Sequence, residues 1–117
     1  MAILVSFDID GTLEAGDPPG PITMEMVRKA KAHGCIIGSS SDRPLPVQQG
    51  IWDRHDIVVS FVSAKHQLAD IKTRFDAEAY YHIGDTEMDQ QFALEAGFDF
   101  LWMDAGHTEP WIINQET

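Results

Sequence analysis

Residues 2–14 read AILVSFDIDGTLE and join a strand-like apolar run to two closely spaced acids. The run 2–7 is almost entirely apolar, which is typical of a strand that is covered on both faces. Asp8 and Asp10 follow at once, and the Gly-Thr pair behind them indicates a turn. Two carboxylates at the edge of a core repel each other unless a cation neutralises them. We therefore expect a cation site where this strand ends.

Four further short apolar stretches occur along the chain and are rich in Ile, Val, Phe and Tyr. They are residues 35–39, 57–62, 80–83 and 98–103. Helical patterns separate them, and the segments expected to be helical are 23–33, 64–75, 86–96 and, in part, 44–55, which opens with prolines. Alternation of strands with helices predicts an α/β fold of three layers, a doubly wound, Rossmann-like parallel sheet. We expect residues 1–117 to form a single domain.

The composition limits the classes of function. Apolar residues make up 44% and charged residues 23% of the chain, as in ordinary globular proteins. The formal net charge of −11 produces a field that repels nucleic acid and anionic membranes. No apolar run is long enough to span a bilayer and no basic segment precedes an apolar one, so we expect a cytoplasmic protein without a membrane partner. The single cysteine, Cys35, lies in an apolar run and is expected in the core.

Polar side chains gather where the predicted strands end, which is the edge where ligands bind in such sheets. Asp85 follows the strand 80–83 in the stretch HIGDTEMD, and Asp89 lies one helical turn later. Carboxylate, carbonyl and water oxygens suit Mg²⁺. We expect Mg²⁺ to contact the carboxylate of Asp8, the backbone carbonyl of Asp10 and the carboxylate of Asp85. Asp89 completes the predicted metal site and is expected to act through water or a lysine.

Two segments resemble motifs of the haloacid dehalogenase-like superfamily of phosphatases. Residues 7–13, FDIDGTL, resemble its first motif, and residues 84–89, GDTEMD, resemble its fourth. Between them the family places a Ser or Thr at the end of the second strand and then a Lys near the start of a helix. The matching residues in this chain are Ser41, in the pattern Ser-x-Arg-Pro, and Lys65, with Ser40 and Lys72 as alternatives. The resemblance spans essentially the whole chain.

The resemblance also implies a role for each residue. Asp8 is the expected nucleophile, which forms an aspartyl-phosphate, and Asp10 is the expected general acid and base. Ser41 is expected to donate a hydrogen bond to a phosphoryl oxygen, and Lys65 to neutralise charge on the transferring group. Mg²⁺ reduces the repulsion between nucleophile and phosphate. Asp10 favours phosphoester chemistry, because the dehalogenases lack an acid there and the ion-pumping branch has Thr.

Many family members carry a cap domain after the first or the third motif. The segments between Asp10 and Ser41 and between Lys65 and Asp85 are too short for one. We therefore predict a small capless member with the strand order 5-4-1-2-3. A capless site is open, so it should accept bulky substrates or be covered by a neighbouring subunit. Aromatic residues such as Trp111 are compatible with a homo-oligomeric interface.

We expect a small phosphorylated metabolite as substrate. The alternative is the phosphorylated 3′ end of a nucleic acid, which the acidic balance disfavours. A different class is a noncatalytic regulatory domain that keeps the metal site for binding. The five histidines lack the spacing of metal ligands, so none is assigned to a metal, although His66 and His107 are candidates to approach the site.

Overall fold

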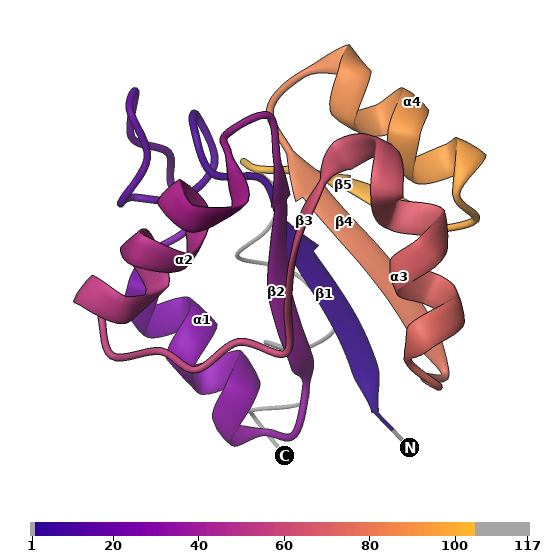
Figure 1. The fold of residues 1–117 in the computed structure, drawn as a ribbon, viewed down its shortest axis with the longest axis horizontal. Helices are drawn as coiled ribbons and strands as arrows, with labels where there is room; N and C mark the ends of the chain where they lie inside the picture. The colour runs from indigo at the N-terminus through magenta and orange to yellow at the C-terminus, as the bar shows by residue number, and fades with distance from the viewer. Residues whose placement is uncertain (1, 105–117) are drawn as a thin grey trace.

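Strands and helices alternate along the chain in the computed structural model, which describes residues 2–104 (Figure 1). The strands are β1 (Ile3–Phe7), β2 (Ile36–Ser41), β3 (Phe61–Ala64), β4 (Ala79–Gly84) and β5 (Asp99–Trp102). The helices are α1 (Met24–Ala32), α2 (Leu45–Arg54), α3 (Leu68–Arg74) and α4 (Glu87–Glu95), with the 3-10 turn η1 (Lys65–Gln67) directly before α3. Within residues 2–104 no further domain is inserted between these elements.

The five strands form one parallel sheet in the order β3-β2-β1-β4-β5. This confirms the predicted order 5-4-1-2-3, counted from the other edge. The chain runs from β1 toward one edge and then returns to the other side of β1 to form β4. The order therefore reverses between β1 and β4, which is where ligands bind in open α/β sheets. Asp8 directly follows β1 and Asp85 directly follows β4.

Helices cover both faces of the sheet: α1 and α2 lie on one side, and α3 and α4 lie on the other (Figure 1). Residues of β1 alternate between the two apolar clusters. Val5 and Phe7 pack in the cluster that includes α1 and α2, whereas Leu4 packs with α3 and α4. All three are fully buried. Burial on both sides explains why this strand is apolar throughout rather than alternating.

Local signals explain where two of the helices begin and end. Thr23 Oγ1 accepts a hydrogen bond from the Met26 N–H at 3.1 Å and caps α1. Thr86 Oγ1 accepts one from the Asp89 N–H at 3.2 Å and caps α4. Gly34 and Gly97 follow these helices with φ of 91° and 81°, a conformation that glycine adopts without steric cost. The predicted caps and stops of both helices are confirmed.

The predicted strand 57–62 is wrong in its first four residues, because β3 begins only at Phe61. Ile57 is buried, but its N–H donates to the carbonyl of Trp52 as part of the turn after α2. Val58 is 77% exposed. The apolar run therefore includes both the connection after α2 and the start of β3. An apolar pattern alone does not distinguish a connecting segment from a strand.

The α2 region is helical from Leu45 to Arg54, as expected, with Pro44 at its N-cap. Prolines are tolerated there because the first turn of a helix has no partner for its N–H groups. Trp52 on this helix is fully buried, in agreement with a core role, whereas Cys35 is half-buried rather than fully enclosed. Trp111 and His107 lie outside the described residues. No helix within residues 2–104 has the length and apolar character needed to cross a membrane.

Candidate metal centre

One cavity of about 170 Å³ lies at the edge of the sheet where the strands end. Four parallel strands deliver side chains to it, because parallel strands share the same end. The residues that line it are Asp8, Asp10, Ser41, Asp42, Lys65, Asp85 and Thr86. All the residues singled out from the first, second and third motifs thus meet there, together with Asp85 of the fourth.

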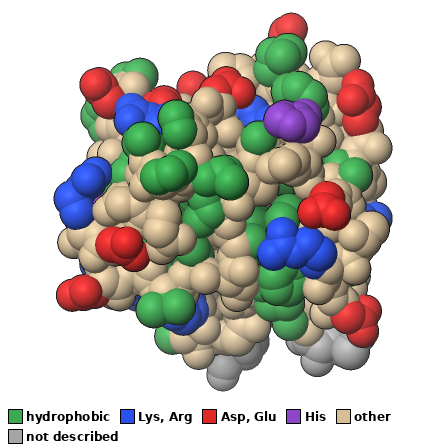
Figure 2. All heavy atoms as spheres, viewed as in Figure 1, with side chains coloured by type: hydrophobic (Ala, Val, Ile, Leu, Met, Phe, Trp, Pro, Cys, Tyr) green, Lys and Arg blue, Asp and Glu red, His purple; other side chains and the backbone are tan. Residues whose placement is uncertain are grey.

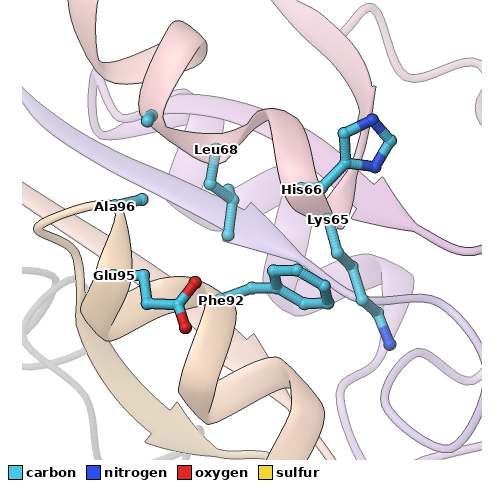
Figure 3. Close-up of a pocket in the computed structure, with 7 residues that line it drawn as sticks. Lys65, His66, Leu68, Phe92, Glu95 and Ala96 are labelled. Atoms are coloured by element: carbon cyan, nitrogen blue, oxygen red, sulfur yellow. The ribbon is translucent and has the colours of Figure 1, made fainter.

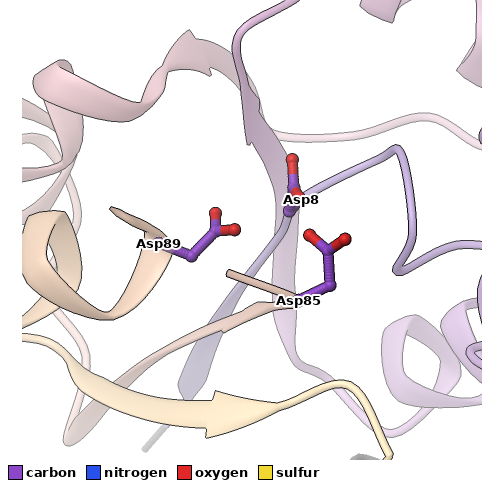
Figure 4. A group of neighbouring side chains, drawn as sticks. All are labelled: Asp8, Asp85 and Asp89. Atoms are coloured by element: carbon purple, nitrogen blue, oxygen red, sulfur yellow. The ribbon is translucent and has the colours of Figure 1, made fainter. Parts of the chain in front are cut away.

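Three carboxylates converge beside this cavity. Oxygens of Asp8, Asp85 and Asp89 all lie within 4.8 Å of one another, and Figure 4 shows the three side chains directed toward a common space. Asp8 and Asp89 are buried and Asp85 is half-buried. Opposite oxygen ligands of Mg²⁺ or Ca²⁺ lie about 4 to 5 Å apart. The group therefore has the ligand type and the span of a hard divalent cation site.

Two glycines make room for two of these carboxylates. A Cβ on Gly84 would lie 2.3 Å from Cγ of Asp89. A Cβ on Gly11 would lie 1.9 Å from Oδ2 of Asp85, and Gly11 also has φ of 77°. Glycine is thus required at position 11 both by its backbone conformation and by the close approach of Asp85.

We expect Gly11→Ala to weaken divalent-cation binding at least about tenfold, because the new methyl group forces Asp85 out of the cluster. Isothermal titration with Mg²⁺ or Mn²⁺ measures this change. Gly34→Ala is the matched control, since Gly34 also has a positive φ, of 91°, but has no atom within 4 Å of the added Cβ. The control should lose about 1 kcal/mol of stability and bind the cation normally. Equal cation affinity in both variants would contradict this account of Gly11.

The charge of the cluster is balanced in part by Lys65, which is only 7% exposed. Its Nζ lies 3.1 Å from Asp89 Oδ1 and 3.7 Å from Asp8 Oδ1. Although burial opposes the shift, these two carboxylates raise the pKa of Lys65. The alternative, Lys72, lies elsewhere and donates to the carbonyl of Gly97. Lys65 is therefore the lysine that the fold brings to the acids.

Burial and neighbouring groups shift the pKa values of the two buried carboxylates in opposite directions. Burial, followed by repulsion from Asp89, raises the pKa of Asp8 to about 8. Burial also disfavours the charged form of Asp89, but hydrogen bonds from His82 and Thr86 and the attraction of Lys65 lower its pKa to about 2. Without a cation, Asp8 therefore holds a proton near neutral pH. A divalent cation would replace that proton, as expected at a metal centre.

The carboxylate of Asp10 lines the same cavity but is bound by Arg43. It accepts two hydrogen bonds from Arg43, from Nε and Nη2, each of 2.8 Å, and one from the Asp17 N–H at 2.8 Å. The Arg43 hydrogen bonds lower the pKa of Asp10. Its carboxylate is not part of the cluster, and metal contact through its backbone carbonyl stays a prediction. Sequence analysis missed the Arg43 partner, although Arg43 stands in the Ser-x-Arg-Pro pattern.

The structure separates the two candidate serines by the direction of their side chains. Ser41 lines the cavity, and its Oγ accepts a hydrogen bond from the Arg43 N–H at 3.1 Å. The Oγ of Ser40 instead lies inside the sheet, 2.9 Å from Ser6 Oγ and 2.8 Å from Ser63 Oγ. Ser41 is therefore placed to meet a ligand in the cavity, whereas Ser40 is part of the interior. The catalytic roles of Ser41, Lys65, Asp8 and Asp10 stay predictions.

A second cleft of about 250 Å³ adjoins the first across Lys65 (Figure 3). Leu68 and Phe92 point into it from the two helices α3 and α4. His66, a candidate to approach the site, lines this cleft and not the acidic cavity. The candidate metal group found within residues 2–104 consists of Asp8, Asp85 and Asp89.

His82 is the buried neighbour of the cluster that sequence analysis left without a role. It is fully buried, and its Nε2 lies 2.9 Å from Asp89 Oδ1. A signal was present in the sequence: an ionisable residue interrupts the apolar strand 80–83, two residues before the Gly-Asp pair. Such a residue remains in a core only with polar partners.

The motifs and this geometry are the basis for any functional assignment. Comparison of the chain with family models, with curated proteins and with solved structures found no match. The residues themselves support an α/β protein of Rossmann-like fold with an acidic, metal-type site at the strand ends.

Proposed function

We propose that this chain is a capless phosphatase of the haloacid dehalogenase-like type, which uses Mg²⁺ to hydrolyse phosphate monoesters. One observation carries the proposal: three aspartates converge around a buried lysine, beside a cavity at the carboxyl edge of a parallel sheet. The short motifs that resemble the family supply these side chains, in order along the chain.

In the proposed reaction, Asp8 Oδ attacks phosphorus, the bond to the leaving oxygen breaks, and an aspartyl-phosphate forms on Asp8. Lys65, which contacts Asp8, neutralises charge on the transferring phosphoryl group. The Ser41 hydroxyl donates a hydrogen bond to a phosphoryl oxygen. Bound Mg²⁺ would supply charge stabilisation on the phosphoryl oxygens, and Asp8, Asp85 and Asp89 are the residues that would hold it. Water then attacks the aspartyl-phosphate and releases inorganic phosphate.

Asp10 is the proposed acid that protonates the leaving oxygen and the base that activates the water. While Arg43 holds its carboxylate, Asp10 is ionised and cannot give a proton. The pair is about one-third exposed, 32% for Arg43 and 34% for Asp10, so it can open without large loss of packing. A phosphate ester that attracts the Arg43 guanidinium would free Asp10 to take up a proton.

The proposed substrate is a small phosphorylated metabolite. The chain has 19 acidic and 8 basic residues, and the face shown in Figure 2 carries Lys and Arg side chains among acidic ones without a continuous basic band. A nucleic-acid backbone needs such a band to offset repulsion. The open cavity and the adjoining cleft leave room for a leaving group larger than phosphate itself.

The test of the activity is release of inorganic phosphate from a generic aryl phosphate by the purified chain. We expect turnover with Mg²⁺, loss of turnover with excess EDTA, and recovery when Mg²⁺ is returned. Acid-quenched protein should carry one phosphoryl group that alkaline treatment removes, as for an acyl phosphate. Turnover that EDTA leaves unchanged would contradict the metal-dependent mechanism.

The test of the substrate class is a panel of phosphorylated metabolites assayed beside an oligonucleotide with a 3′-phosphate. We expect the highest kcat/KM on a member of the metabolite set. A clear preference for the oligonucleotide would overturn the proposed class and leave the phosphatase chemistry in place. Tight Mg²⁺ binding without turnover on any substrate would favour a noncatalytic domain instead.

A further inference from the structure

A hydrogen-bonded network of polar side chains runs through the apolar interior behind the candidate metal centre. His82 lies on β4, between β1 and the edge strand β5, and bonds through both ring nitrogens: Nδ1 is 3.0 Å from Ser6 Oγ and Nε2 is 2.9 Å from Asp89 Oδ1. The hydroxyl of Ser6 donates to Ser40 Oγ at 2.9 Å, and Ser40 Oγ lies 2.8 Å from Ser63 Oγ. The network thus links four neighbouring strands, β3, β2, β1 and β4, to helix α4.

A polar network of this kind is unusual in the interior of a sheet. His82, Ser6 and Ser40 are fully buried, and Leu4 of the same sheet face packs in an ordinary apolar cluster. Apolar side chains at these positions would fill the layer without the cost of removing polar groups from water. Every side chain of the network has a hydrogen-bond partner, and such a complete network holds its groups in one arrangement. The arrangement ends at a single carboxylate, that of Asp89.

Asp89 is held from several directions. Its Oδ1 lies 2.9 Å from His82 Nε2 and 3.1 Å from Lys65 Nζ, and its Oδ2 accepts a hydrogen bond from Thr86 Oγ1 at 2.8 Å. The carboxylate is completely buried, so no water replaces a lost contact without rearrangement. Because a carboxylate only accepts hydrogen bonds, Nε2 of His82 is the donor in this pair. The ring therefore shares Oδ1 of Asp89 with Lys65 and helps to fix the orientation of the whole carboxylate.

We propose that His82, held by the hydrogen-bonded network, is a positioning residue that sets the orientation of Asp89 and thereby the geometry of the metal centre and of Lys65. The inference rests on the metal centre of the proposed function. It goes beyond that function because it makes the affinity for the cation depend on a residue buried behind the site. Partners behind metal ligands commonly change metal affinity by about 10- to 100-fold when removed.

The test is Mn²⁺ affinity, measured by isothermal titration on the full chain without substrate. We expect His82→Phe to bind Mn²⁺ about 10- to 100-fold more weakly than the wild type. His82→Gln should recover most of the affinity, because its side-chain amide can donate to Asp89 as Nε2 does. Ser39→Ala is the control, since Ser39 is a buried serine of the same sheet whose partners are Gln48 and Trp52 rather than Asp89. It should lose stability and keep its Mn²⁺ affinity.

Each outcome decides the inference. Wild-type affinity in His82→Phe overturns it, and so does equal weakening in His82→Gln and His82→Phe, because the ring would then act only by packing. If His82→Phe does not fold, Ser6→Ala takes its place, with a several-fold loss of affinity expected and an unchanged affinity counting against the inference. A wild type that binds no Mn²⁺ overturns the metal centre and the inference together, whereas failure of the His82 variants alone leaves the proposed function intact.

Discussion

Asp8→Asn is expected to reduce kcat for aryl phosphate hydrolysis by a factor of about 10⁴ or more, as loss of a catalytic nucleophile does in other enzymes. The amide that replaces the carboxylate has nearly the same shape, but it cannot attack phosphorus and form the acyl phosphate. Asp8 is buried at the end of β1, so the substitution changes charge without adding volume. Phosphate release and acid-quench trapping of phosphoprotein measure the two consequences separately.

Asp42→Asn is the matched control for this experiment. Asp42 lines the same cavity and lies 3.5 Å from Lys65 Nζ, but its side chain is 84% exposed. An exposed ion pair of this kind contributes little, so kcat should stay within about threefold of the wild type. If Asp8→Asn hydrolyses the substrate as fast as Asp42→Asn, Asp8 is not the nucleophile and the proposed reaction is wrong.

The fold was predictable because its signals are local and agree with one another. The continuous apolar run before Asp8 indicated a strand covered on both faces, and the structure buries it between two helical layers. Thr23 and Thr86 marked helix starts, and Gly34 and Gly97 marked helix ends, through backbone geometry that depends on few neighbours. The start of β3 was mispredicted because a buried connecting segment and a buried strand share the same apolar composition.

The site was predictable only in part. Asp8, Ser41, Lys65 and Asp85 each follow or end a strand, so the topology of a parallel sheet places them at one edge. The bond between Arg43 and Asp10 depends on the conformations of two loops, which no periodic pattern encodes. The contact of His82 with Ser6 depends on strand register, since these residues are paired across β1 and β4. Both therefore required the three-dimensional structure.

A second large effect is expected in the stability of the protein without metal. The folded protein holds the Asp8 proton up to a pKa of about 8, whereas the unfolded chain releases it near 3.8. Between these values the folded state binds more protons than the unfolded state, so the stability from this group falls as the pH rises. The lowered pKa of Asp89, about 2, makes its own contribution constant above about pH 5.

Thermal unfolding in EDTA between pH 5.5 and 8 measures this effect against Asp8→Asn, whose amide does not titrate. We expect the midpoint of the wild type to fall relative to that of the variant by roughly 10–15 °C, from on the order of 3 kcal/mol of linked free energy. The comparison cancels the histidines and other groups that titrate in both proteins. A constant difference between the two midpoints across this range would contradict the raised pKa of Asp8.

Saturating Mg²⁺ should abolish the trend in the wild type, because the cation-bound folded state and the unfolded chain both hold Asp8 ionised above about pH 5. A cation that binds the ionised carboxylates competes with the Asp8 proton, so its apparent affinity should increase by up to about tenfold for each pH unit below 8. The stabilisation by a fixed Mg²⁺ concentration therefore grows with pH, and at 100 times the dissociation constant it reaches about 2.7 kcal/mol. Asp8→Asn lacks both the proton and one ligand, so Mg²⁺ should raise its midpoint little at any pH. A cation effect of equal size in both proteins would mean that the ion binds away from Asp8.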